Sequence, residues 1–441
     1  MLASKPRRRP RSGRQTRDSL PSSSYAYDAL VLDGAFKQSL ASIRSLGKAR
    51  LRVATSECFA ECDPGLPVAG FLSKYSSRNE ILPSYIADAK AYGAAIVDFV
   101  RRHPTRVVLP TMDGSIATLM AIREQLAEMG CTVALATNTA LEVANDKHRT
   151  LELAAGLGIY RPQTVRIDAV EELPTLLATF EFPFVLKPRI SWAAQSATRL
   201  APIEVVNERE AAEVSERFLT AGVSVLGQQL ATGRREGVTL FLADGNVVAS
   251  CAHAALRTTP ALGGASVMRV SIPAPIDILD SSVRLAKAIG LEGACEVEFR
   301  RASDGRPLLM EINARLAGTI KNSVHSGVDF PLLAWKWAAG YPLTAIGNYR
   351  TGIRTRWLRG DIRWLRDNSS RAGRPDSLPK LQAMRIFAAD FVRTRHYDSV
   401  HGFDIGPVIG ELRIMAAAAR KARESNSDIA DIRSQGAPHA R

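Results

Sequence analysis

The chain has 441 residues, of which 46% are hydrophobic and 23% charged, a composition typical of a globular protein with roughly two to four domains. It has no run of about 18 apolar residues, so we expect no membrane-spanning helix, and its basic N-terminus lacks the apolar stretch of a secretory signal. Five cysteines, an odd number, argue against a disulfide scaffold and favour a reducing, cytoplasmic compartment.

The N-terminus carries a large share of the net charge of +14. The first twenty residues hold seven Lys or Arg and one Asp, a net charge of +6. Because this segment is rich in Pro, Ser and Arg, we expect residues 1–25 to form a disordered basic tail. We interpret the tail as dispensable, and an arm that touches RNA or an anionic surface is the alternative. Elsewhere in the chain nucleic acid is not an expected partner.

Residues 26–140 alternate between apolar runs and stretches of helical periodicity, which predicts a small open α/β sheet of parallel strands. Asp113 follows one strand, at the edge where open sheets hold ligands, although we prefer to interpret it as a helix N-cap. The region lacks a G-x-G-x-x-G motif, so dinucleotide binding is not supported. Strands are expected at 27–33, 51–56, 105–111 and 131–137, and helices at 36–49, 84–102 and 114–130.

Two lysines occur where a cation needs an anionic partner. Lys147 opens a predicted helix, and a positive charge at a helix N-terminus opposes the helix dipole. Lys187 lies at the end of the apolar strand 183–189, and a buried ammonium group is costly unless it meets an anion. Both lysines therefore predict contacts with a strongly charged anion such as a phosphate.

A predicted hairpin near residue 300 has acidic and amide side chains. The extended runs 293–301 and 306–315 are joined by an Asp-Gly turn. Period-2 alternation puts Glu311 and Asn313 on one face of their strand, and Glu298 would meet them from the facing strand. Two carboxylates and an amide oxygen suit Mg²⁺ or Mn²⁺ held together with substrate phosphates. A solvated hairpin with acidic outer positions is the alternative.

In this order, the two lysines and the acid–acid–amide hairpin resemble the ATP-grasp superfamily over roughly residues 140–345. The resemblance implies an N-terminal open parallel α/β lobe followed by a two-lobed ATP-grasp fold that binds ATP and Mg²⁺ between its lobes. It implies phosphate contacts from Lys147 and Lys187, and metal ligation by Glu298, Glu311 and Asn313. It also implies that Arg315 steadies the transferred phosphoryl group. Along the hinge strand it implies adenine and ribose contacts from Gln229, Leu230, Ala231 and Glu236.

The activity implied by the resemblance is that of a carboxylate–amine ligase. A carboxylate substrate would attack the γ-phosphate of ATP, and an amine would then displace phosphate from the acyl phosphate. Lys187 and Arg315 would stabilise the developing charge. Two alternatives remain open: an enzyme that phosphorylates or carboxylates its substrate without forming an amide, and a non-catalytic nucleotide-binding protein. The expected partners are small carboxylates and amines, and a homodimer is compatible with this activity.

The chain departs from the family pattern after the second lysine. ATP-grasp proteins often have a glycine-rich flap there, whereas residues 190–198 contain no glycine. The Gly263-Gly264 pair could take part of that role, and a plain turn is the alternative. Arg257 and Arg269 are candidates to anchor the substrate carboxylate, with surface ion pairs as the alternative.

The remaining segments complete the expected domain organisation. Residues 346–425 form a region rich in Arg and Trp. Arginine beside tryptophan can stack, bind anions or lie on a membrane surface. We expect this region to lie against the grasp core. Asn322 and His325 could reach an acceptor pocket, although a packed role is preferred. The expected divisions are a tail at 1–25, an N-terminal domain at 26–140, a small lobe at 141–225, a large lobe with the metal hairpin at 226–345, an Arg/Trp-rich helical region at 346–425 and a disordered tail at 426–441.

Overall fold

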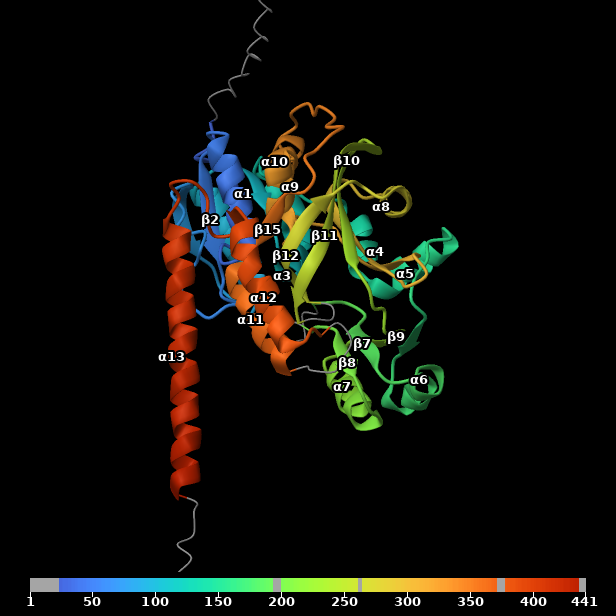
Figure 1. Ribbon diagram of the computed structural model, residues 1–441. Coiled ribbons are helices and arrows are strands. Elements are labelled where there is room, and N and C mark those ends of the chain that lie inside the picture. The colour runs from blue at the N-terminus through green and yellow to red at the C-terminus, as the bar shows by residue number, and fades with distance from the viewer. Residues whose placement is uncertain (1–23, 193–199, 261–263, 371–376, 436–441) are drawn as a thin grey trace, which may run out of the picture.

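The structure, a computed structural model, describes residues 24–192, 200–260, 264–370 and 377–435, with side chains up to residue 420. These residues form an N-terminal lobe, a small lobe, a large lobe and a C-terminal segment (Figure 1). Nearly all of the predicted basic tail, most of the glycine-free flap and Gly263 lie outside the described residues.

The N-terminal lobe is a five-stranded parallel sheet in the order β3-β2-β1-β4-β5. The chain leaves β1 and β4 in opposite directions, so their carboxyl ends form the crevice where open α/β sheets bind ligands. Strand β3 was not predicted, because its sequence SSRNEI is polar and lies at the sheet edge. The elements are β1 Tyr27–Val31, α1 Lys37–Lys48, β2 Val53–Glu57, β3 Ser76–Ile81, α2 Ala89–Arg102, β4 Thr105–Leu109, α3 Asp113–Glu128 and β5 Thr132–Val133.

The small lobe is built on an antiparallel sheet in the order β6-β9-β7-β8. Helices α6 and α7 pack on it, and apolar side chains such as Leu176, Phe184 and Phe218 form its own separate core. The elements from α4 onward are α4 Asn138–Asn145, α5 Lys147–Gly156, β6 Thr164–Ile167, the short η1 Val170–Glu172, α6 Leu173–Thr179, β7 Phe184–Pro188, β8 Ile203–Val205, α7 Glu208–Thr220 and β9 Val225–Gln229.

The large lobe is a seven-stranded sheet in the order β14-β13-β10-β11-β12-β15-β16. Its apolar side chains and those of the N-terminal lobe belong to the same two cores, so these two lobes are packed together. The elements are β10 Arg235–Ala243, β11 Asn246–Thr259, β12 Ala265–Ile272, α8 Ile276–Ile289, β13 Gly293–Arg301, β14 Pro307–Asn313, α9 Ile320–Ser326, α10 Phe330–Ala338, β15 Arg354–Arg356 and β16 His396–Tyr397.

The C-terminal segment contains α11 Leu358–Ser370, α12 Lys380–Arg393 and α13 Gly406–Gln435. As expected, α11 lies against the large sheet, where Trp364 packs beside Val267. Helix α13 projects beyond the body of the molecule (Figure 1). It continues to Gln435, so the prediction that disorder begins at residue 426 is wrong for 426–435, where the preceding Ala-rich sequence favours a continuous helix. Within the described ranges, no helix is both long and apolar enough to cross a bilayer.

Arg257 and Arg269 form buried ion pairs within this segment's interface. Arg257 binds Asp361 and Asp390 at 2.6 Å each, and Arg269 binds Asp398 at 2.5 Å. Neither side chain is more than 7% exposed. The expected ion pairs are therefore confirmed, but they are buried and not at the surface, and the acidic partners of both arginines come from a distant part of the chain.

Candidate functional site

The hairpin formed by β13 and β14 brings the predicted acid–acid–amide set together. Glu298 lies opposite Glu311 in the antiparallel ladder, as the alternation predicted. The side-chain amide nitrogen of Asn313 lies 3.4 Å from one carboxylate oxygen of Glu298 and 3.4 Å from one of Glu311. The three side chains therefore converge on one face of the hairpin, and their role as metal ligands remains a prediction.

Buried charge surrounds the two carboxylates. Burial raises the pKa of Glu298 to about 7, and the ion pair with Arg235 opposes that rise. Burial also acts to raise the pKa of Glu311, but Lys147, Arg235 and Lys187 outweigh it and hold that pKa below its usual value. Glu311 therefore supplies a permanent negative charge at the centre of a ring of cations.

The donor set fits a divalent cation that is shared with a substrate. Two carboxylates and an amide, which can offer its oxygen, match the oxygen ligands that Mg²⁺ prefers. In the part of the chain that the structure describes, no three His, Cys, Asp or Glu side chains form a metal-binding group. The set is therefore incomplete for a permanently held ion and is suited to Mg²⁺ that completes its shell with phosphate oxygens and water.

Sequence reasoning missed Arg235 and chose its neighbour Glu236. Arg235 begins β10 and pairs with Glu298. Glu236 points to the other side of the strand, where it is fully buried and pairs with Arg234 and Arg301. The structure does not bring Glu236 to the cleft, because adjacent residues in a strand face opposite ways. The alternation of β10 was the signal that could have selected Arg235.

Both predicted lysines are buried close to this set. Lys147 is the first residue of α5, is 8% exposed and donates to Oγ of Ser191 at 2.6 Å. Asp146 caps the same helix, and its acid offsets the unfavourable position of the lysine. Lys187 lies on β7, also 8% exposed, and its ammonium has no hydrogen-bonding partner among the described residues. Burial lowers the pKa of Lys187 to about 8, although Glu311 acts to raise it.

Arg315 lies two residues after the end of β14 and joins the large lobe to the N-terminal lobe. Its Nε donates to a carboxylate oxygen of Asp113 at 2.7 Å. Asp113 is the first residue of α3 and Met112 is the N-cap, so the prediction of Asp113 as the cap is wrong. The acid instead reaches from the carboxyl-end crevice of the parallel sheet to the arginine beside the hairpin.

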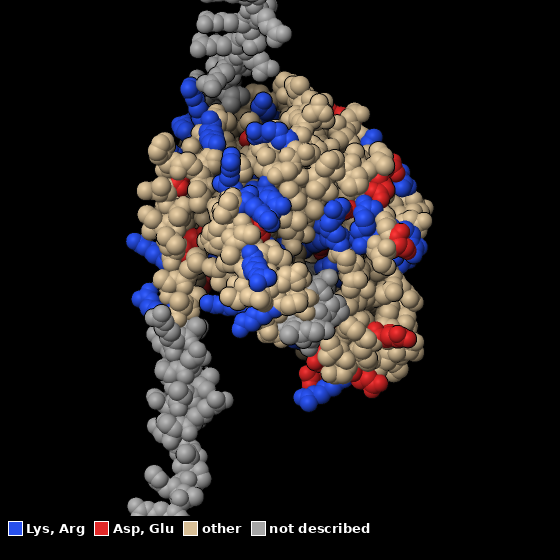
Figure 2. Space-filling view, in the orientation of Figure 1, with Lys and Arg blue, Asp and Glu red and all other residues tan. Residues whose placement is uncertain are grey.

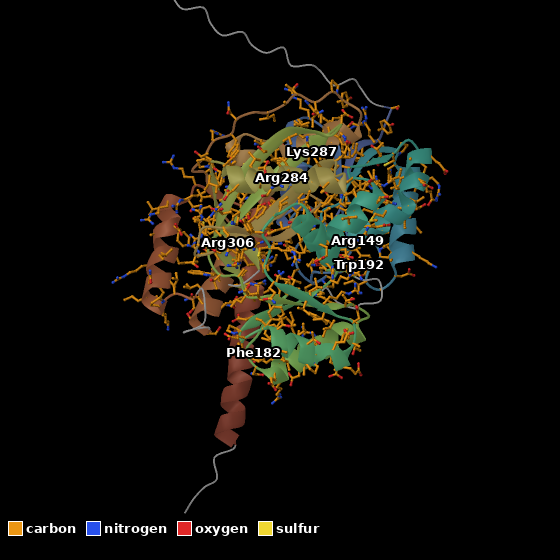
Figure 3. The ribbon with its side chains drawn as sticks, turned by 90° about the vertical axis from the view of Figure 1, so that its right-hand side faces the viewer. Arg149, Phe182, Trp192, Arg284, Lys287 and Arg306 are labelled. Atoms are coloured by element: carbon orange, nitrogen blue, oxygen red, sulfur yellow. The ribbon has the colours of Figure 1, made fainter. Side chains whose placement is uncertain are left out.

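Two cavities meet at Glu311 and Met310. The first, about 60 Å³, lies between the small and large lobes and is walled by both Lys187 and Glu298. Of the predicted adenine contacts, Gln229, Leu230 and Ala231 line it. The second, about 450 Å³, lies between the N-terminal lobe, the small lobe and β14, and Lys147 and Asn313 line it. Figure 3 views the molecule from the side on which the small lobe meets the N-terminal lobe.

Glu296 is a further buried carboxylate that the sequence reasoning passed over. It lies opposite Asn313, is 1% exposed and accepts hydrogen bonds from Thr239 and Thr319. The Glu-Val-Glu spacing with Glu298 could have identified it, since residues two apart share a strand face.

Asn322 and His325 do not line either cavity. Asn322 donates to the backbone oxygen of Ile353 at 2.8 Å, and His325 stacks on His396 with ring centroids 4.0 Å apart. The preferred prediction of packed roles is confirmed for both.

Comparison with known proteins gives the same assignment as the geometry. A family model described as an ATP-grasp in the biosynthetic pathway with Ter operon matches residues 257–360, which include the β13–β14 hairpin and Arg315. The carbamoyl phosphate synthase large chain of Thermoplasma acidophilum is 23% identical over 270 residues, 58% of this chain and 25% of that protein. The resemblance to the ATP-grasp superfamily is thus confirmed, most directly over the residues that the family model matches.

Solved ATP-grasp folds superpose on most of the chain. The biotin carboxylase domain of the Hydrogenobacter thermophilus 2-oxoglutarate carboxylase, solved as a dimer with MgADP, ADP and bicarbonate, is 16% identical with a TM-score of 0.58 and covers 74% of this chain and 73% of its own. L-amino acid ligase from Bacillus licheniformis is 16% identical with a TM-score of 0.53, over 72% and 75%. The predicted N-terminal parallel lobe followed by a two-lobed ATP-grasp fold is confirmed. The chain spans about a quarter of the length of the curated relatives that it matches.

Proposed function

We propose that this ATP-grasp protein is a Mg²⁺-dependent carboxylate–amine ligase that cleaves ATP to ADP and phosphate. The observation that supports the proposal best is the convergence of five predicted side chains from α5, β7, β13 and β14 around Glu311. Two of the five are buried cations and two are carboxylates, an arrangement that suits a triphosphate with its metal ion. The set consists of Lys147, Lys187, Glu298, Glu311 and Asn313.

The first chemical step needs positioning and charge neutralisation more than covalent help from the protein. The substrate carboxylate attacks the γ-phosphorus, the bond to the β,γ-bridging oxygen breaks, and ADP leaves. Lys147 and Lys187 offset the phosphate charge, and Glu298, Glu311 and Asn313 would hold the metal ion. A bound Mg²⁺ would screen the phosphate oxygens and orient them for the transfer.

Arg315 is suited to the second step. Its guanidinium lies beside the hairpin and is already oriented by Asp113, so it can bind the acyl phosphate and the departing phosphate with little reorganisation. The amine nitrogen forms a bond to the acyl carbon as the bond to the phosphate oxygen breaks. Phosphate leaves, and the amine loses its proton to phosphate or water.

The decisive experiment measures ADP and phosphate release over a panel of small carboxylates and amines, with product mass by mass spectrometry. A ligase gives ADP, phosphate and an amide in equal amounts. A carboxylate kinase or carboxylase gives ADP without an amide, and a non-catalytic nucleotide binder gives no ADP above background.

Replacing Glu311 tests the site itself. We expect Glu311→Gln to abolish ATP turnover and to leave the protein folded, because it removes a charged metal ligand at little steric cost. ADP release and a thermal melt, measured on the same sample, check the prediction. ADP release close to that of the unchanged protein would refute the assignment of the hairpin.

The remaining expectations concern location and partners. All five cysteines are free, which supports a reducing, cytoplasmic location. A homodimer stays a prediction for this chain, as does the restriction of any nucleic-acid contact to the basic tail.

A further inference from the structure

The 450 Å³ cavity extends well beyond the groups that a nucleotide would use. Glu311, Asn313 and Lys147 form its inner end, beside the predicted phosphate position. The rest is walled by α3 of the N-terminal lobe, α4, the first turn of α5 and residues 190–192. The adenine-side cleft lies on the other side of Glu311. The outer part of the larger cavity is therefore available to a second substrate.

Part of the lining of this cavity is apolar. Ala117 and Met120 come from α3, Ala144 from α4 and Ile312 from β14. Trp192 completes the wall, and its ring packs edge-on against Tyr85 of the N-terminal lobe with centroids 6.0 Å apart. Aliphatic and aromatic surface would be sheltered from water here, so the ligand is expected to have an apolar side chain.

Two carboxylates, Asp113 and Glu142, also line this cavity. Asp113 lines it next to Asn313 and is oriented by Arg315. Glu142 of α4 lines it at an exposed position. These acids favour a cationic or amine group in the ligand, and the position of Asp113 places such a group beside the arginine that would hold an acyl phosphate.

Hydrogen-bond donors that suit a carboxylate also line this cavity. Arg149, on the first turn of α5, is exposed, and its guanidinium forms no ion pair with a described residue. The buried indole N–H of Trp192 has no acceptor among the described residues. Figure 3 shows Arg149 and Trp192 close together where the small lobe meets the N-terminal lobe. An unsatisfied buried donor next to an unpaired guanidinium favours a carboxylate.

The features of this cavity suit one class of ligand. They are an acid near the reacting end, an apolar wall, and a guanidinium group with an indole N–H. We infer that this cavity binds the acceptor amine as an amino carboxylate with an apolar side chain, its nitrogen toward Asp113 and its carboxylate toward Arg149 and Trp192. The inference rests on the proposed ligase function and narrows the amine that the enzyme takes.

Binding can be tested without turnover, using the full-length protein saturated with Mg²⁺ and a non-hydrolysable ATP analogue. Isothermal titration compares leucine with isoamylamine and phenylalanine with phenethylamine, which differ only in the carboxylate. We expect each amino acid to bind about tenfold or more tightly than its amine, the range for one lost charged hydrogen bond. Equal affinities, or no binding of any of the four, would overturn the inference.

Three variants test which residues make the protein bind an amino acid more tightly than the corresponding amine. Arg149→Met should bring the affinity of the amino acid close to that of the amine, and Trp192→Phe should weaken the amino acid only, while keeping the ring against Tyr85. Lys287→Met, which removes an exposed cation on α8 away from the cavity, should change neither affinity. If Arg149→Met weakens the nucleotide analogue and leaves the discrimination intact, Arg149 belongs to the nucleotide site and the inference fails.

Failure of the inference can be separated from failure of the proposed function. Hydroxylamine traps an acyl phosphate as a hydroxamate and needs no amine pocket. Hydroxamate formation with a panel carboxylate, together with equal binding of amino acids and amines, would refute the pocket assignment alone. Absence of both nucleotide binding and hydroxamate would refute the ligase assignment itself.

Discussion

At the scale of single residues, buried charged side chains are the main reason why the cleft between the lobes suits an anionic ligand. Lys187 is 8% exposed, lies near Glu311, and has no hydrogen-bonding partner among the described residues. A buried ammonium in that position destabilises the empty protein. A phosphate would supply the missing acceptor, so the energy of this cation is recovered when nucleotide binds.

Lys187→Met tests this directly, because Met keeps the aliphatic stem and removes the charge. We expect the affinity for ATP to fall by roughly 1.5–3 kcal/mol, the range for a lost charged hydrogen bond. Calorimetry at saturating Mg²⁺ measures the change. Removal of an unpaired buried charge should also leave the thermal stability equal or higher, and an unchanged nucleotide affinity would show that the lysine has only a structural role.

Asp33, in the crevice between β1 and β4, gives a prediction for pH. Its carboxylate accepts from the backbone N–H groups of Thr111 and Met112 at 2.9 and 3.0 Å, yet burial raises its pKa from 3.8 to about 7. The folded chain therefore binds a proton that the unfolded chain has lost in this window. The contribution of Asp33 makes the free energy of unfolding fall as pH rises from about 4 to about 7.

The variant Asp33→Asn isolates that contribution, because the amide oxygen can still accept the backbone hydrogen bonds. Denaturant unfolding at pH 5 and pH 8 should show a smaller loss of stability with rising pH in the variant than in the unchanged protein. The same slope in both proteins would contradict the assignment to Asp33.

At the scale of elements, buried ion pairs attach the C-terminal helices to the large sheet. Asp361 of α11 is fully buried and holds two arginines, Arg257 of β11 in a two-point contact at 2.6 and 2.7 Å and Arg356 of β15 at 2.7 Å. Trp364 of the same helix packs beside Val267, and Asp390 of α12 is a second buried partner of Arg257. The position of α11 against the sheet thus depends strongly on one carboxylate.

Asp361→Asn should destabilise the protein by about 3–5 kcal/mol, because it removes the buried counter-charge that Arg257 and Arg356 share. Asp280→Asn is the matched control, since Asp280 pairs with Arg284 at 2.7 Å on an exposed helix face and should cost only about 0.5 kcal/mol. Chemical denaturation of both variants gives the comparison. Similar losses would mean that the buried network contributes little.

Prediction from the sequence succeeded where the signal is local. Apolar periodicity located the helices and buried strands of the N-terminal lobe, and the site lysines and hairpin acids were found because each is unusual in its own segment. It failed for Arg257, whose partner Asp361 lies 104 positions away, and for Glu236, whose direction depends on the register of β10. Charge is visible in a sequence, but the pairing of charges requires the fold.

At the scale of the whole molecule, the positive charge is dispersed. On the face shown in Figure 2, Lys and Arg lie in separate patches over the body, and acidic residues lie among them. In the C-terminal region Arg356 is buried in an ion pair with Asp361, and the half-buried Arg354 pairs with Asp390. The net charge of +14 therefore does not by itself describe a nucleic-acid surface.

A variant that lacks residues 1–21 tests the role of the basic N-terminus. We expect it to fold and to keep ATP-dependent activity, because the first strand of the lobe begins at Tyr27. If the segment serves nucleic acid, only the full-length chain should bind RNA or DNA, and that binding should weaken with salt as counterions are released. Loss of turnover in a correctly folded variant would show that the segment takes part in catalysis.

The separate core of the small lobe has a mechanical consequence. The N-terminal and large lobes share their apolar cores, and α4 and α5 pack into one of them, whereas the β6-β9-β7-β8 sheet with α6 and α7 has a core of its own. A swing of the small lobe about its two connections would break little apolar contact, and it would open both cavities at once, since each has a wall from that lobe. For the proposed ligase, such a hinge would make release of ADP depend on friction with the solvent, so we expect steady-state turnover to slow as viscosity rises.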